Sequence, residues 1–261
     1  MNSSYPAFYM YDSKIAKNST EEVHLQKIAQ HFMAGLQRHY DTLSFNLASR
    51  QSVSEEFYVR ISKAPKLVPS ESAHQNFKQI TNYTRELLTR QILAESINLA
   101  VIALNNAHYF LSLVKAAGGS RHASPELQEV ALASQRSFAA LPLEEKFNQL
   151  EKDYGIMCEL EDSILAMGQA MNALLYQQGR LASEQLNGDG QLVIELKALA
   201  VDDANQQGEG KLVDVRLEFA AGDEVALSDA ELQLAIITIA SFANSLFKSV
   251  ECFSRTTCKV D

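Results

Sequence analysis

Three histidines and one glutamate near the start of the chain have residue types that bind metal ions. Glu21 and His24 form a Glu-x-x-His pair, the spacing that carboxylate-bridged metal bundles place on one helix. Such a centre also needs glutamates on facing helices. His31 and His39 follow, but they lie about 80° apart around a helix. We therefore expect solvated histidines on the flank of a helix, and we predict neither a metal site nor a cofactor.

A second group of polar residues lies in the most apolar stretch of the chain, Ile92 to Val114. Four of them form a polar stripe that could line the pocket of a small-molecule or metal-dependent enzyme. The alternative is that these residues form the one solvent-exposed face of a helix, or a network of buried side chains whose hydrogen bonds are all satisfied. So many polar groups would be prohibitive in hydrocarbon, so we expect a buried helix and no membrane partner. The stripe consists of Glu95, Asn98, Asn105 and Asn106, and His108 follows it.

Other motifs that carry chemistry are missing from the sequence. It has no glycine-rich phosphate loop, no Gly-x-Ser-x-Gly elbow and no paired Cys/His nucleophile. The chain is acidic, with 32 acidic and 23 basic residues and a net charge of -9. This balance disfavours broad nucleic-acid binding, but it leaves room for a local basic site because salt screens the repulsion. Acid runs such as Glu144-Glu145 are expected to be solvated helix surface.

The cysteines and the N-terminus indicate a cytoplasmic protein. Cys158, Cys252 and Cys258 make an odd number without a Cys-x-x-Cys pair, which favours reduced thiols, with a Cys252–Cys258 bridge as the alternative. The first ten residues have neither a basic start nor an apolar run, so we expect no signal peptide.

Hydrophobic periodicity predicts the elements that position these residues. The predicted fold is mainly α, a multi-helix bundle of six or seven helices with one β-hairpin before the C-terminal helix. We expect residues 1–18 to form an N-terminal arm and residues 19–261 to form a single helical domain. Helices are predicted at Thr20 to Ser49, Glu71 to Ala117 (one helix or two), Ser124 to Ala140, Pro142 to Gly155, Ile156 to Ser183 and Asp229 to Phe253, and Phe57 to Ile61 is either a strand or a helical turn.

The sequence period changes to two at about residues 190–220. Apolar residues alternate with mostly polar ones on both sides of a glycine-bearing loop, Asp202 to Gly210, which predicts two antiparallel strands. A two-stranded sheet is marginal by itself, so the hairpin must pack on the helices. Ser228 and Glu231 then have the spacing of a capping box for the last helix.

One stretch of the helical region carries a resemblance to a known family. It runs from Glu145-Lys146-Phe147 through Tyr154-Gly155-Ile156 to Met171-Asn172-Ala173-Leu174-Leu175-Tyr176-Gln177-Gln178-Gly179. This stretch resembles the second half of HEPN-family domains, helical bundles in which one helix carries Arg-Asn-x-x-Val-His, often before a turn glycine. The earlier helix with Glu95 is similar to that family's first long helix, and the resemblance covers about residues 77–250.

The chemistry of that family, where present, is metal-independent RNA cleavage at a dimer interface, in which Arg holds the phosphate and His moves the proton. Met171 stands at the Arg position here and Tyr176 at the His position, while Asn172 is retained. Methionine donates no hydrogen bond, and tyrosine is a poor base at neutral pH. The resemblance therefore implies a degenerate active site without catalytic residues. It also implies a homodimer paired through the helix around Met171 and Leu174, and a role in bacterial defence or toxin–antitoxin systems.

Three functions remain open from the sequence. The leading hypothesis is a non-catalytic, HEPN-like protein that self-associates and binds an unknown protein partner. The second is an RNA-binding or residual RNA-processing protein, whose binding residues would be Asn172, Tyr176, Gln177 and Arg180. The third is a small-molecule or metal-dependent enzyme that uses the polar stripe of the central helix.

Overall fold

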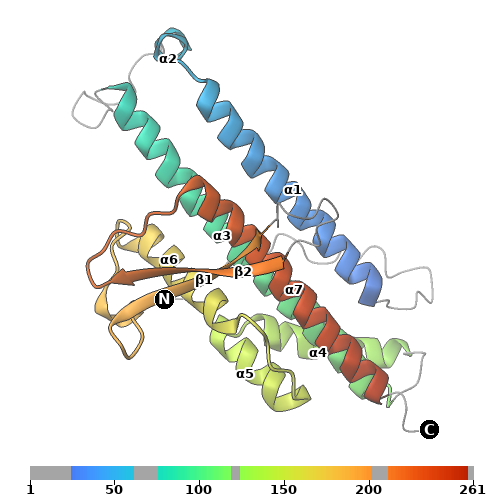
Figure 1. Ribbon diagram of the computed structural model, residues 1–261. Helices are drawn as coiled ribbons and strands as arrows, with labels where there is room; N and C mark the ends of the chain where they lie inside the picture. Colours follow the sequence, from blue (N-terminus) through green and yellow to red (C-terminus); the bar gives the residue numbers. More distant parts are fainter. Residues whose placement is uncertain (1–24, 62–75, 119–123, 201–210, 258–261) are drawn as a thin grey trace.

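The computed structural model describes residues 25–61, 76–118, 124–200 and 211–257, and the predicted N-terminal arm lies outside them. The described residues form seven α-helices and one antiparallel hairpin before the last helix, which confirms the predicted fold class (Figure 1). The elements are α1 (Leu25–Ser52), α2 (Glu55–Ile61), α3 (Phe77–Ala116), α4 (Pro125–Ala139), α5 (Leu143–Tyr154), α6 (Glu161–Tyr176), the short 3-10 turn η3 (Ser183–Gln185), β1 (Gln191–Ala200), β2 (Lys211–Ala220) and α7 (Asp229–Thr257).

The long helix α3 is the central element of the bundle. The Asn76 side chain caps its N-terminus by accepting a hydrogen bond from the Gln79 amide at 3.0 Å. Gly118 follows its C-terminus in the left-handed region, with φ of +55°. Helix α3 contacts α1, α4, α5, α6 and α7, and its residues Leu93 and Leu104 are fully buried. The apolar stretch predicted to be a buried helix therefore lies at the centre of the core.

Helix α7 packs against both α3 and α1 and so closes the core. The Phe32 ring of α1 meets the Phe247 ring of α7 edge to face, with centroids 5.9 Å apart. The predicted capping box is confirmed, because the Ser228 amide donates to the Glu231 carboxylate at 2.6 Å and the Glu231 amide donates to the Ser228 hydroxyl at 3.2 Å. The helix thus begins where local sequence alone says it should.

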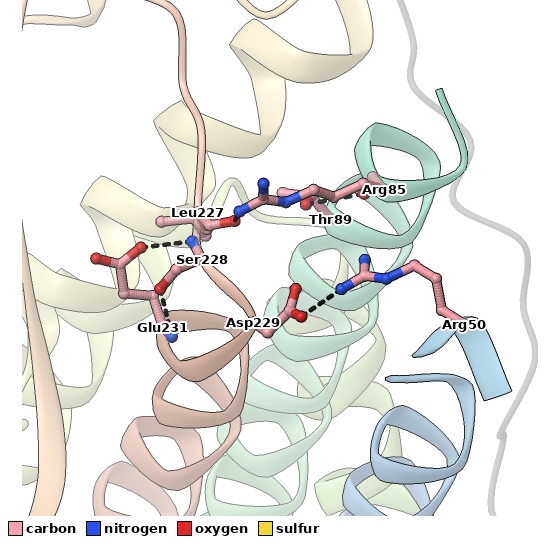
Figure 2. A network of polar contacts seen from close by, with 7 residues as sticks. All are labelled: Arg50, Arg85, Thr89, Leu227, Ser228, Asp229 and Glu231. Atoms are coloured by element: carbon pink, nitrogen blue, oxygen red, sulfur yellow. Dashed lines mark hydrogen bonds and ion pairs between the residues drawn. The ribbon is translucent and has the colours of Figure 1, made fainter. Parts of the chain in front are cut away.

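Two arginines join the start of α7 and the segment just before it to the neighbouring helices, as Figure 2 shows. Arg50, near the end of α1, forms an ion pair with Asp229. Arg85 of α3 donates a hydrogen bond to the Leu227 carbonyl at 3.2 Å, and its own carbonyl accepts from the Thr89 hydroxyl at 3.1 Å. These contacts fix α1 and α3 to the start of α7.

The hairpin packs on α6 and α7 through β1. Ile194 and Leu196 of β1 are each 1% exposed, and they lie opposite Leu217 and Val215 of β2. The hairpin is also attached through its backbone, because the Lys197 amide donates to the hydroxyl of Thr238 on α7 at 2.8 Å. Helix contact therefore stabilises a sheet that would be marginal alone.

The structure settles two alternatives left by the sequence. Residues 57–61 belong to helix α2, whose first turn is capped by the Ser54 hydroxyl accepting from the Phe57 amide at 3.1 Å. Residues 77–116 form one helix and not two, while residues 71–75 lie outside the described residues.

One predicted helix is shorter than expected. Helix α6 begins at Glu161 and not at Ile156, because Gly155 (φ +68°) ends α5 and the Ile156 amide turns back to the Leu150 carbonyl at 3.3 Å. Ile156 therefore belongs to the closing turn of α5. Helix α6 also ends at Tyr176 and not near Ser183, because positive φ angles follow within three residues.

Two helices, α3 and α7, are long and apolar enough by composition to cross a membrane, with a mean hydropathy of 1.4 over an 18-residue window in each. Half of each window is buried inside the chain, and the two helices pack on each other. Core helices of soluble proteins pass the same test, so composition alone does not assign a membrane role to either helix.

Candidate functional site

The residues that the HEPN resemblance singles out lie at the C-terminal end of α6. Tyr176, the last residue of the helix, is 75% exposed, and Asn172 lies one turn earlier and is half-buried. Met171 and Leu174 face the other way and are only 6% and 4% exposed. Both side chains are already used in the core of their own chain and do not face a second copy, while the predicted pairing through this helix stays a prediction.

The chain reverses direction immediately after α6. The Gly179 amide donates back to the Ala173 carbonyl at 2.9 Å, and Gly179 has a φ of +81°, which glycine adopts most easily. The following residues then run antiparallel to the segment before α7: the Leu181 amide donates to the Asp223 carbonyl at 3.0 Å, and Arg180 lies opposite Glu224 in an isolated bridge.

The last two predicted binding residues lie in this turn. Arg180 is exposed, and its guanidinium donates to the Gly222 carbonyl at 3.3 Å. Gln177 is half-buried, and its side-chain oxygen is buried without a hydrogen-bond partner in the described part of the chain. The four predicted residues thus share one end of α6, but they do not all reach solvent. Tyr176 offers a ring for stacking, and Arg180 offers a positive charge. These four residues do not combine an arginine that holds a phosphate with a base that moves a proton.

A buried polar group that the sequence interpretation missed lies between α3, α4 and α5. Lys146 is 1% exposed, and its ammonium donates to the Asn105 side-chain oxygen at 3.1 Å and to the Phe138 carbonyl. The same ammonium lies 4.5 Å from the centre of the Phe138 ring. Burial lowers the pKa of Lys146 to about 8. The lysine supplies donors to the last turn of α4, which is a capping role.

His108 extends this group toward α5. It is 1% exposed and stacks on the Phe138 ring with centroids 4.0 Å apart. Its Nδ1 lies 3.5 Å from the Ser112 hydroxyl, which is 2.9 Å from the Tyr154 hydroxyl. Burial lowers the pKa of His108 to about 4, and Asp153 offsets only part of this effect. Its Nε2 is buried without a partner among the described residues, so a neutral imidazole fills this position.

We interpret Lys146 and His108 as packing residues and not as a reaction centre. Two hollows of the described surface, of about 540 and 290 Å³, are lined by other residues. Asn105 belongs to the predicted polar stripe, but its side chain binds Lys146 and its carbonyl accepts from Gln135 at 3.4 Å. Asn98 of the same stripe is exposed. The predicted stripe is therefore divided. Asn98 lies on the solvent-exposed face of α3 and Asn105 belongs to the buried hydrogen bonds around Lys146, so the stripe does not surround one pocket.

The smaller hollow is acidic and lies where α6 meets β1. Burial raises the pKa of the Cys158 thiol to about 12, which keeps it protonated and unreactive. Burial is also the main cause of a raised pKa for Glu161, with Asp162 and other acids adding to it. Both Cys158 and Cys252 are free, while Cys258 lies outside the described residues. The residues that line this hollow are Cys158, Leu160, Glu161, Asp162, Ser163 and Glu195.

Most of the residues that the sequence suggests as metal ligands lie outside the part of the chain that the structure describes. Glu21 and His24 lie outside the described ranges, as does a second Glu-x-x-His pair, Glu71 to His74, which the sequence interpretation overlooked. Within the described ranges, no group of three or more His, Cys, Asp or Glu side chains could hold a metal ion. His31 is exposed and His39 half-buried.

The arrangement defines a class by architecture alone: a helical bundle around one long central helix, with a hairpin docked before the last helix. Comparison with family models, with curated proteins and with solved structures finds no match for the chain.

Proposed function

We propose that this is a non-catalytic, HEPN-like cytoplasmic protein that acts by self-association and by binding a protein partner. The separation of the two motif positions carries this proposal: Met171 lies in the core, whereas Tyr176 is 75% exposed. Neither side chain can hold a phosphate by a fork of donors, and the two do not share a site. The resemblance of the motif region to HEPN domains supports a role in bacterial defence or toxin–antitoxin systems.

Apolar side chains on the surface support a binding role. Helix α2 has no buried residue, and its Phe57, Val59 and Ile61 are 45%, 53% and 66% exposed. Figure 1 shows α2 at the far end of α1 and α3, away from α4 and α5. Leu175 and Tyr176 form a second exposed apolar pair at the end of α6. Exposed apolar patches often mark the sites at which a protein binds another protein.

Native mass spectrometry of the purified full chain tests the proposal, with the ratio of absorbance at 260 and 280 nm measured beside it. The chain has no tryptophan and nine tyrosines, so bound nucleic acid would be conspicuous. We expect the mass of a dimer with no additional mass from a bound ligand. We also expect RNA to remain intact after incubation with the protein. A bare monomer at all concentrations, or cleavage of the RNA, would contradict the proposal.

A second candidate function is RNA binding at the end of α6. The exposed ring of Tyr176 and the exposed guanidinium of Arg180 favour it, because stacking and phosphate contact are the means by which proteins hold single strands. If RNA binds there, Arg180→Ala should weaken binding and make its salt dependence shallower by about one phosphate contact. Unchanged affinity and salt dependence would exclude this function.

A further inference from the structure

Among the residues that the structure describes, no strand pairs with the outer edge of β2. The helices that support the sheet pack on β1, while β2 lies on its far side. Leu212 and Val213 of β2 are 46% and 38% exposed, and the side chains of Asp214 and Arg216 are 61% and 57% exposed. A sheet edge with free backbone groups is a template for another strand.

Three hydrogen bonds show which backbone groups of β2 point outward. The Lys197 amide donates to Thr238 and not to its opposite residue Asp214. The Ala220 amide donates to the Asp223 carboxylate at 2.7 Å, and the Ala220 carbonyl accepts from the Asp223 amide at 3.1 Å. Asp214 and Ala220 therefore occupy the non-hydrogen-bonded positions of the ladder.

By the alternation of an antiparallel ladder, every second residue of β2 turns its amide and carbonyl away from β1. Ala220 is already satisfied by Asp223. The other four outward residues exchange no backbone hydrogen bond with any residue that the structure describes. These four residues are Leu212, Asp214, Arg216 and Glu218.

The charges of this edge match those of a second copy in one register. If two β2 strands run antiparallel about a twofold axis at Val215, Asp214 of each copy lies opposite Arg216 of the other, and Leu212 lies opposite Glu218. All four free backbone residues then pair, at two hydrogen bonds for each pair, about eight in all. On the inner face, Val215 meets Val215 of the second copy.

Neighbouring registers fit less well. An axis at Arg216 sets the two arginines against each other and Asp214 against Glu218, and like charges directly opposite are destabilising. An axis at Leu217 sets Arg216 opposite Glu218, but it pairs Asp214 with Ala220, whose backbone is already bound by Asp223, and so loses about half of the backbone hydrogen bonds. The chain thus fits its own copy best about Val215.

We propose that the protein forms a homodimer by antiparallel pairing of β2 with β2 of a second copy, centred on Val215, to give a continuous four-stranded sheet. This inference rests on the proposed self-association and names the surface that performs it. It does not involve the exposed apolar residues of α2, which remain open to a different partner.

Charge reversal tests the register in the full chain. Asp214→Arg and Arg216→Asp each place like charges opposite each other in the proposed dimer, so each variant should dimerise roughly tenfold more weakly in analytical ultracentrifugation. When the two variants are mixed, every cross-strand pair is again one arginine opposite one aspartate. We therefore expect a heterodimer in native mass spectrometry. Circular dichroism checks that both variants are folded.

A cysteine cross-link tests the axis independently. In a chain carrying Cys252→Ser and Cys258→Ser, Val215→Cys should form an intermolecular disulfide under mild oxidation, because the two copies of this position face each other. Leu217→Cys, on the same face of the same strand, should not, because it lies opposite Val213. Equal cross-linking of both variants would overturn the register.

Other outcomes distinguish this inference from the proposed function. A dimer that neither charge variant weakens and that Val215→Cys does not cross-link would overturn the β2 surface while leaving self-association intact. A monomer at all concentrations would overturn both. If the Asp214 and Arg216 amides of such a monomer resist hydrogen exchange, another segment of the same chain covers the edge.

Discussion

Lys146 shows how a charged side chain can be placed in a core when every part of it is satisfied. Burying an ammonium is costly unless hydrogen bonds replace its water. Here the Asn105 oxygen, the Phe138 carbonyl and the Phe138 ring surround it. The lysine therefore joins three helices through one atom. Its loss leaves the Asn105 side-chain oxygen without this donor, whereas the Phe138 carbonyl still accepts from the Leu141 amide at 3.1 Å.

The first prediction concerns this lysine. Lys146→Met keeps the length of the side chain but removes its donors, so we expect the free energy of unfolding to fall by about 2 kcal/mol. Urea denaturation measures the change. Lys152→Met, an exposed lysine on the same helix, is the matched control and should change stability by less than about 0.5 kcal/mol. Equal effects of the two substitutions would show that Lys146 is not buried as described.

The second prediction is a pH dependence from His108. Its pKa is lowered from 6.5 to about 4 by burial, so the unfolded chain takes up a proton between these values and the folded chain does not. Stability from this group is therefore complete above pH 6.5 and is lost as the pH falls toward 4, by about 3 kcal/mol at most.

His108→Phe keeps the stacking on Phe138 but removes the titration. Denaturation at several pH values from 7 to 4 should give a shallower loss of stability for the variant than for the parent chain. Carboxylates titrate in both proteins, so the difference between the two curves carries the result. Parallel curves would contradict a buried neutral histidine.

At the scale of elements, one hydroxyl joins the backbone of the hairpin to α7, in addition to the packing of the apolar side chains of β1. Thr238 is fully buried, accepts from the Lys197 amide and donates to the Leu234 carbonyl at 2.8 Å. Thr238→Val leaves that amide buried without a partner, so we expect a loss of about 1–3 kcal/mol in unfolding free energy. Thr238→Ser, which keeps the hydroxyl, should lose less. Faster hydrogen exchange of the Lys197 amide in the valine variant alone would identify the bond.

Helix α6 provides the second element-scale prediction, through two neighbouring leucines. Leu174 is 4% exposed and Leu175 45%. Leu174→Asp buries a carboxylate in the core, so it should unfold the chain or cost about 4 kcal/mol or more, whereas Leu175→Asp should cost less than about 1 kcal/mol. Thermal unfolding compares them. A folded, monomeric Leu174→Asp variant would restore the original idea that this residue lies in a dimer contact.

The elements that sequence predicted well are those specified by local chemistry. Ser124 with Pro125, the Ser228 and Glu231 pair, and Gly118 mark helix ends by contacts within a few residues. The start of α6 was misjudged because Ile156 has the spacing of the next helix but turns back onto Leu150. Apolar spacing alone cannot distinguish these two uses of one isoleucine.

At the scale of the whole molecule, the site could be predicted only in part. The order of the four residues at the end of α6 follows from the chain, but the direction in which each points depends on what packs against that helix. Glu144 and Glu145 predict a solvated helix surface, but Lys146 directly after them is enclosed by the assembled helices. The available signal was Phe147 and Leu150 beside it, which mark this part of α5 as the inner face.

The pairing of α1 with α7 has a consequence for biosynthesis. Phe32 meets Phe247, and Arg50 meets Asp229, so the first described helix completes its packing only against the last. During translation the apolar stripe of α1 therefore stays uncovered by its partner until α7 has left the ribosome. A transcript truncated before residue 229 would yield a product that keeps this stripe open to chaperones and proteases. The packing of α1 thus reports whether synthesis has passed α7, because that helix covers the apolar stripe of α1.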